Sequence, residues 1–143
     1  GWYYICKVKL SSVSAVKFEV GVKDAITGEG VVDAKTTPTF TATDGACIIF
    51  DTDHNTEVAF ISVNAGVVGA NAVSVLTMDT AYHIFELVGQ GSQVAGYADG
   101  KLIGGGAITV TAPLTPYLMA VARSGSARAL QADYQGMVGP EAA

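Results

Sequence analysis

Alternation of apolar and polar residues with a period of two is the feature that most constrains how this chain can fold. Between Val16 and Lys23, four apolar residues would share one face of an extended strand and three charged residues the other. This pattern is typical of a strand with one buried face, so the charged residues Lys17, Glu19 and Lys23 are expected to face solvent. The segment Trp2–Leu10 shows the same trend, with inward positions at Tyr4, Cys6, Val8 and Leu10.

Turn-forming residues divide the rest of the chain into further short strands. The clearest turn is Asp99-Gly100, because this dipeptide tolerates the positive φ angles of a type I′ hairpin turn. With no convincing helix, about ten short strands predict a sandwich or a barrel. A short strand is also expected near Thr39–Ala42, within the long connection 24–45. The other predicted strands are 46–51, 57–64, 72–78, 82–88, 93–98, 101–104, 107–111, 116–123 and 127–138.

Size and composition are those of a single domain over residues 1–143. Half of the residues are apolar, 15% are charged and the net charge is −5, which allows one core without disulfide staples. No apolar run approaches the roughly 20 residues that span a bilayer, so the protein is expected to be soluble, without a membrane partner. The eight Lys and Arg residues are scattered, so a nucleic-acid partner is not expected either.

The cysteines and the first residue lead to two further expectations. Cys6 and Cys47 each lie in an apolar run and are predicted to be reduced and buried, the alternative being one bridge between strands. The chain begins at Gly1 without an initiator Met or a signal peptide, from which a fragment lacking N-terminal residues is expected.

Several segments of the second half resemble one family in their order. Tyr82–Leu87 leads through a glycine turn to the hairpin Val94–Gly104, and Leu114–Val121 follows before a closing Asp133-Tyr134. This order resembles the laminin-G-like members of the concanavalin A-like superfamily. The resemblance implies an all-β fold, an antiparallel two-sheet jelly-roll sandwich.

Segments of the first half resemble phage virion versions of this domain. Lys7–Val13, Val20–Ala25 and Ile48–Asp53 follow the order of a "V-K-L-S", a "V-G-L-x-D" and an "F-x-F-D-T-D" strand. The resemblance implies a non-enzymatic structural protein of a phage particle, a capsid decoration or fibre domain that binds capsid or other virion proteins, as a homo-oligomer. Such domains normally have a further strand before the position of Trp2, so either that strand is missing or a partner chain covers this edge.

The alternative function is a carbohydrate-binding, lectin-like module with a glycan as its ligand. It would need two or three exposed aromatic residues on one concave face. The aromatic residues Tyr4, Phe18 and Phe50 fall on presumed inward positions, which favours the structural role. A third hypothesis is an adhesion module of a larger extracellular protein.

One loop has an oxygen-rich pattern that could supply ligands to Ca²⁺. Asp51, Asp53, Asn55 and Glu57 place an acid or an amide at every second residue, and Ca²⁺ takes six to eight oxygen ligands. The loop is not an EF-hand, because its sixth position is Thr56 rather than glycine. We favour the other interpretation, a polar hairpin turn without a cofactor.

The sequence contains no recognisable catalytic arrangement. Glycoside hydrolysis needs two carboxylates that face one cleft; the glucanases of the superfamily carry theirs as Glu-x-Asp-x-x-Glu, and no such run occurs here. A Gly-x-Ser-x-Gly nucleophile elbow is absent as well. His54 and His83 lack further ligands at zinc-binding spacing. No enzymatic activity, catalytic residue or metal is therefore predicted.

Two small clusters remain as candidates for contacts. Trp2, Tyr3 and Tyr4 form the one aromatic cluster; Tyr4 is expected to be buried, whereas Trp2 and Tyr3 are interface candidates, since aromatic residues dominate binding hot spots. Gly104–Gly106 is expected to be a flexible connection between strands rather than a phosphate cradle, because no helix follows it.

Overall fold

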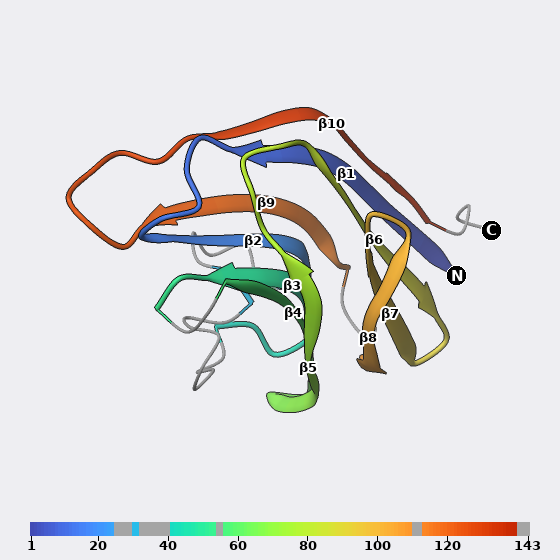
Figure 1. Cartoon of the computed structure of the whole chain (residues 1–143). Coiled ribbons are helices and arrows are strands. Elements are labelled where there is room, and N and C mark those ends of the chain that lie inside the picture. Colours follow the sequence, from blue (N-terminus) through green and yellow to red (C-terminus); the bar gives the residue numbers. More distant parts are fainter. Residues whose placement is uncertain (25–29, 32–40, 54–55, 110–112, 140–143) are drawn as a thin grey trace.

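The chain forms two five-stranded antiparallel sheets that pack face to face (Figure 1). The computed structural model describes residues 1–24, 30–31, 41–53, 56–109 and 113–139. Among these residues no helix is long and apolar enough to cross a membrane. The strands are β1 (Trp2–Leu10), β2 (Val16–Lys23), β3 (Gly45–Asp51), β4 (Glu57–Asn64), β5 (Val67–Thr77), β6 (His83–Gln90), β7 (Gln93–Ala98), β8 (Lys101–Ala107), β9 (Thr115–Ala122) and β10 (Leu130–Val138).

The strand order identifies the sandwich as a jelly roll. Sheet A has the order β10-β1-β6-β7-β8, and sheet B has the order β5-β4-β3-β2-β9. The chain passes between the sheets after β1, β5, β8 and β9, so the first and last strands are neighbours in sheet A. The predicted fold class, an all-β antiparallel two-sheet jelly-roll sandwich, is confirmed.

Most predicted strands are present with ends shifted by up to three residues, and two regions differ more. The predicted strand 72–78 overlaps the longer strand β5, which begins at Val67 and ends at Thr77. The predicted strands 101–104 and 107–111 overlap a single strand, β8, which ends at Ala107; residues 110 and 111 lie outside the described residues. The short strand expected near Thr39–Ala42 lies partly outside the described residues, and Thr41 and Ala42 are not in a strand.

The main core fills the space between the two sheets. In β1 every second residue from Trp2 to Leu10 is buried, and the alternation predicted this for the last four, Tyr4, Cys6, Val8 and Leu10. The rings of Phe18 in sheet B and Phe85 in sheet A cross the core, with their centroids 5.3 Å apart. Burial of such large apolar side chains is the main stabilising contribution to the fold.

Sheet B is buried on its outer face as well, which corrects one prediction. Lys17, Glu19 and Lys23 were expected in solvent, but their exposed fractions are 4%, 0% and 6%. The reason is a second apolar cluster on the outer face of sheet B, where Val31 from the β2–β3 connection covers the strands. Its members are Val31, Cys47, Ile49, Ala59, Ile61 and Val63, with Tyr117 packed against them.

Both cysteines are free and buried, as predicted. Cys6 belongs to the main core, and burial raises the pKa of its thiol to about 12. Cys47 lies in the second cluster on the other side of sheet B, and burial raises the pKa of its thiol well above its usual value. Because the two side chains are on opposite faces of that sheet, the alternative of a bridge does not apply.

Candidate functional site

The outer face of sheet A carries two adjoining hollows. Side chains alternate across a strand, so Tyr3 of β1, Val88 of β6 and Tyr97 of β7 point away from the core. The first hollow has a volume of about 310 Å³ and is lined by Gly1, Trp2, Tyr3, Val88, Gly89, Gln90 and Val138. The second has a volume of about 390 Å³ and is lined by Val88, Gln90, Gln93, Val94, Ala95, Tyr97, Gly105 and Gly106.

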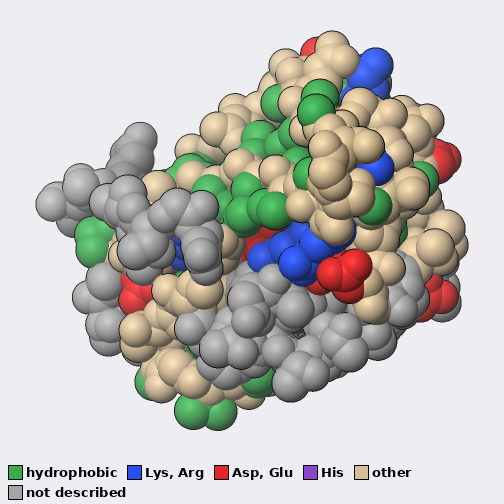
Figure 2. Space-filling view, turned by 90° about the vertical axis from the view of Figure 1, so that its left-hand side faces the viewer, with side chains coloured by type: hydrophobic (Ala, Val, Ile, Leu, Met, Phe, Trp, Pro, Cys, Tyr) green, Lys and Arg blue, Asp and Glu red, His purple; other side chains and the backbone are tan. Residues whose placement is uncertain are grey.

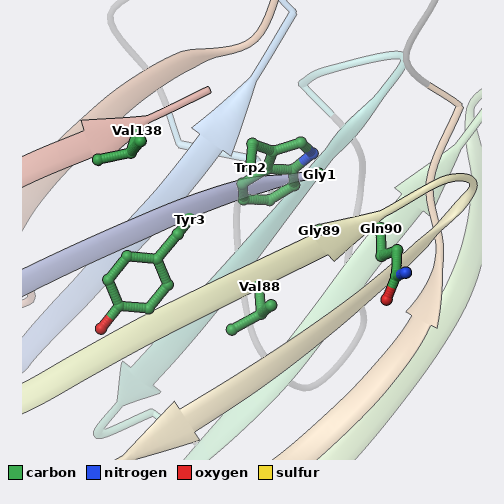
Figure 3. A pocket seen from close by; sticks show the side chains of 7 residues that line it. All are labelled: Gly1, Trp2, Tyr3, Val88, Gly89, Gln90 and Val138. Atoms are coloured by element: carbon green, nitrogen blue, oxygen red, sulfur yellow. The ribbon is translucent and has the colours of Figure 1, made fainter. Parts of the chain in front are cut away.

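Three neighbouring strands build the first hollow. Tyr3 pairs in register with Val88 of β6 and with Val138 of β10, and Figure 3 shows Tyr3 and Val88 side by side. Val88 and Val138 are 38% and 68% exposed, respectively. The hollow is therefore an open apolar surface with a tyrosine at its centre.

Trp2 lies beneath this surface rather than on it. Its exposed fraction is 9%, and its indole ring packs on Gly89, where an added Cβ would come within 2.0 Å of the ring. The Trp2 indole N–H has no hydrogen-bond partner among the described residues. Of the two interface candidates, only Tyr3 thus keeps part of its side chain on the surface, and its role in an interface stays a prediction.

A carboxylate fixes the orientation of Tyr3. The Tyr3 hydroxyl donates a hydrogen bond to Glu86 Oε1, and Glu86 lies on β6 beside Ile5 of β1. This hydrogen bond, followed by burial and by the negative charge of Glu86, raises the pKa of the Tyr3 phenol to about 12.

We expect the Tyr3–Glu86 bond to be visible in a pH titration. Since the folded-state pKa lies above the unfolded value of 10.0, the contribution of Tyr3 to stability is present below pH 10 and is lost as the pH rises toward 12. In Glu86→Gln the phenol pKa should fall toward 10. NMR of ¹³Cζ-labelled tyrosine, assigned with Tyr3→Phe, measures both values. A titration midpoint of Tyr3 near pH 10 in the wild type would contradict the Tyr3–Glu86 hydrogen bond.

Glycines shape the second hollow, and this corrects another prediction. Gly104–Gly106 was expected to be a flexible connection, but it belongs to edge strand β8. Two of these glycines, Gly105 and Gly106, line the hollow. Because glycine has no side chain, the backbone of β8 leaves the ring of Tyr97 and the amides of Gln90 and Gln93 accessible.

The linings of the two hollows contain no charged side chain. They offer tyrosine rings, valine side chains and glutamine amides. Hydrolysis of a glycosidic bond by the usual route needs two carboxylates at the bond, and the linings provide none. The geometry therefore suits binding of an uncharged ligand.

The predicted calcium ligands are partly brought together, around an arginine. Asp51 is fully buried and accepts two hydrogen bonds from Arg123, at 3.1 Å from Nε and 2.6 Å from Nη2, and Asp53 lies 3.4 Å from the same guanidinium. Glu57 begins β4, and Asn55 is outside the described residues. In Figure 2, which shows the end of the sandwich where β3 and β9 end, basic and acidic side chains lie against one another.

Because a guanidinium already neutralises Asp51, we expect Ca²⁺ not to stabilise the domain. A ligand that binds the native state raises the free energy of unfolding by RT ln(1 + [L]/Kd). If no Ca²⁺ binds, the melting temperature should be equal in excess Ca²⁺ and in EDTA. Asp53→Asn, whose side chain is 63% exposed in the parent protein, should behave identically. A Ca²⁺-dependent rise that this variant removes would instead support the calcium hypothesis.

Glu19 lies at the centre of a polar cluster that sequence reasoning missed. Its carboxylate accepts hydrogen bonds from the Tyr117 hydroxyl and from the Val31 backbone N–H, and Lys17 Nζ lies 3.1 Å from Oε2. The Lys23 ammonium is 5.0 Å from the centre of the Tyr117 ring. These residues are covered, so the cluster holds the β2–β3 connection on sheet B rather than presenting a carboxylate to a ligand.

His83 connects the predicted hairpin turn to the loop before β6. The Asp99-Gly100 turn has the expected positive φ angles, 48° and 75°. The two His83 ring nitrogens lie 2.7 Å from Asp99 Oδ2 and 3.2 Å from Asp79 Oδ1. The described residues contain no group of three or more His, Cys, Asp or Glu side chains that could hold a metal ion. His83 thus joins this turn to the loop through its two ring nitrogens, and His54 lies outside the described part of the chain.

No family model matches the sequence, and no curated protein matches it at a significant level. Several solved structures do match. The carbohydrate-binding module CBM66 from Bacillus subtilis is 12% identical with a TM-score of 0.55, over 96% of this chain and 74% of that chain. A Bacillus licheniformis β-glucanase is 16% identical with a TM-score of 0.55, over 96% of this chain and 64% of that chain, so this chain spans less than two thirds of the glucanase.

A third similar structure is galectin LEC-6 from Caenorhabditis elegans, which is 12% identical with a TM-score of 0.53, over 97% of this chain and 83% of that chain. At these identities the likeness concerns the fold alone. A binding module and a glucanase both have it, so it does not decide between an enzyme and a non-enzyme. What the comparisons establish is the fold, an antiparallel two-sheet jelly-roll sandwich.

Proposed function

We propose that this domain is a non-enzymatic glycan-binding module whose ligand lies across the two hollows on the outer face of sheet A. The observation that carries the proposal is the combination of Tyr3 and Tyr97 with Gln90 and Gln93 in linings without a charged side chain. A tyrosine ring offers a flat apolar surface to the C–H face of a pyranose and has a polar tip. Glutamine amides both donate and accept hydrogen bonds, as sugar hydroxyls require.

The shape of the site favours an oligosaccharide over a single sugar. Both hollows share Val88 and Gln90, so they adjoin one another on the outer face of sheet A, between Val138 on β10 and Gly105 on β8. Each hollow is at the small end of the range for ligand pockets, roughly 300–1,000 Å³. The names of two proteins with this fold, a carbohydrate-binding module and a β-glucanase, add support for a carbohydrate ligand.

The two fully buried carboxylates of sheet B, Glu19 and Asp51, do not favour hydrolysis. Glu19 and Asp51 lie on neighbouring strands of sheet B, but both are fully buried. Lys17 neutralises the first and Arg123 the second. Neither can reach a glycosidic bond while these contacts and the Val31 cover remain, so the proposed role is binding without catalysis.

Tyr97→Ala is expected to weaken glycan binding by roughly tenfold to thirtyfold, since loss of a central aromatic contact costs up to about 2 kcal/mol. A glycan array and pull-down on insoluble polysaccharides would identify the ligand, and calorimetry with that ligand would measure the loss. Tyr82→Ala is the matched control, because Tyr82 is 37% exposed but lies beside Lys7 and Lys9, away from the hollows.

Two results would overturn the proposal. One is the absence of binding to any glycan on the array and to any polysaccharide tested. The other is a glycan that binds equally well to Tyr97→Ala and to the wild type, or one that is cleaved. The sequence argued against a lectin from the inward positions of Tyr4, Phe18 and Phe50. Because Tyr97 lies on the outer face together with the interface candidate Tyr3, we rank the lectin-like alternative above the structural role.

A structural role in a phage particle is the second candidate function. It rests on the resemblance of Lys7–Val13, Val20–Ala25 and Ile48–Asp53 to virion domains, and on apolar side chains exposed at sheet edges, Leu102 at 64% and Val138 at 68%. None of the similar structures described above is named as a phage protein. Mass spectrometry of purified particles from the source organism tests this candidate: peptides of this chain should be present at a fixed ratio to the capsid protein, and their absence would exclude the role.

A further inference from the structure

Strand β10 is an edge of sheet A with an open outer side. In the part of the chain that the structure describes, β10 pairs with β1 on one side and with no strand on the other. Figure 1 shows it along the rim of the molecule. Tyr134 and Val138 on this strand are 42% and 68% exposed. An edge of this kind presents unpaired backbone N–H and C=O groups to another strand.

The core is also incompletely covered on this side of the sandwich. Strands β9 and β10 are the edges of sheets B and A here, and four of their apolar side chains pack against the core while remaining partly exposed. Covering them would remove further apolar surface from water. They are Leu118, Ala120, Leu130 and Met137.

The other sheet edges carry features that discourage pairing with another chain. Pro116 on β9 lacks a backbone N–H. Strand β8 contains the Gly104–Gly106 run and a register shift in its pairing with β7, and β5 has two such shifts in its pairing with β4. Strand β10 also has one register shift, in its pairing with β1 at Asp133, but the segment Tyr134–Val138 that follows it has neither a shift nor a charged residue. The charged residue of β10, Asp133, is paired with Lys7 at 2.8 Å.

We propose that β10 pairs antiparallel with β10 of a second copy of this chain, about a two-fold axis at Gly136. In this register Tyr134 of each copy lies opposite Val138 of the other, so the pair occurs twice. Both side chains are on the outer face of sheet A. An aromatic residue opposite a β-branched residue is a favourable cross-strand pair. Gln135 lies opposite Met137 of the second copy on the inner face. No two like charges are opposed, so the edge is complementary to itself.

The pairing joins the two copies of sheet A into one continuous ten-stranded sheet. It uses the strand edge, so both hollows stay open on the outer face. Tyr134 of the second copy would then lie beside Val138, at the rim of the first hollow. Dimer formation does not depend on the proposed glycan binding. A protein that binds glycan as a monomer would contradict only the dimer.

Sedimentation equilibrium with exchanged charges tests this register. The wild type should reach twice the 14.6 kDa of one chain as its concentration rises. The acidic variant Tyr134→Asp/Val138→Asp and the basic variant Tyr134→Lys/Val138→Lys should each be monomeric, because like charges then lie opposite each other. An equimolar mixture of the two should form a dimer, because each Asp then faces a Lys.

Both variants alter exposed side chains, and circular dichroism with a thermal melt verifies that they fold. Leu102→Lys, at a 64% exposed position on the opposite edge of sheet A, is the control that should keep the wild-type mass. The proposal is overturned if the wild type stays monomeric in concentrated solution, if either variant alone remains dimeric, or if the mixture does not dimerise.

Discussion

Replacing Glu19 with alanine is expected to lower the free energy of unfolding by about 3–5 kcal/mol, which corresponds to roughly 10–20 °C in melting temperature for a chain of this size. Glu19 is fully buried and is the common acceptor for Tyr117 and Val31. Its loss leaves the Lys17 ammonium, which is 5% exposed, without this carboxylate. Removing one partner of a buried ion pair lowers the free energy of unfolding far more than removing an exposed ion pair does.

Two controls separate the buried charge from a general loss of packing. Asp133→Ala removes the exposed ion pair with Lys7, whose side chains are 50% and 34% exposed, and should cost at most about 1 kcal/mol. The double variant Lys17→Met/Glu19→Leu removes both charges and should recover part of the loss. Urea denaturation measures all three. If Glu19→Ala lowers the free energy of unfolding no more than Asp133→Ala does, the buried cluster does not stabilise the fold as proposed.

Local sequence patterns were sufficient to predict the parts of the fold that depend on local contacts. The alternation in Trp2–Leu10 correctly placed four side chains in the core. The Asp99-Gly100 dipeptide correctly predicted a hairpin with positive φ at both residues. These features follow from the two-residue period of a strand and from backbone sterics, so no distant residue is needed to explain them.

The surroundings of the candidate site residues and of the buried charges could not be predicted in the same way, because distant segments create them. The burial of Glu19 depends on Tyr117, 98 residues away; from the sequence, Glu19 looked like a solvent-facing charge. Asp51 was a candidate calcium ligand beside the favoured polar turn, and its actual partner, Arg123, is 72 residues away and could not be identified from the sequence. The outward position of Tyr97 follows from the alternation in Val94–Ala98, so for this residue the sequence does contain a signal.

A second large effect is expected at the interface of the two sheets. Phe18→Ala should cost about 3–5 kcal/mol, because the side chain is fully buried and the sheets cannot close the resulting cavity. Phe18 belongs to β2 and Phe85 to β6, and their tilted rings form a contact between the sheets at 5.3 Å. Val121→Ala, at a 39% exposed position, should change stability by no more than about 0.5 kcal/mol.

A double-mutant cycle isolates the ring contact from the cavity. Phe18→Leu and Phe85→Leu keep most of the apolar volume, so their coupling energy reports the aromatic pair, expected at about 0.5–1.5 kcal/mol. Because the pair joins the two sheets, Phe18→Ala should unfold in a single transition at lower urea concentration, with an unchanged slope. Two separate transitions, or a loss of less than about 1 kcal/mol in the free energy of unfolding, would mean that other contacts hold the sheets together. The outer face of sheet A could then keep its hollows without the Phe18–Phe85 contact.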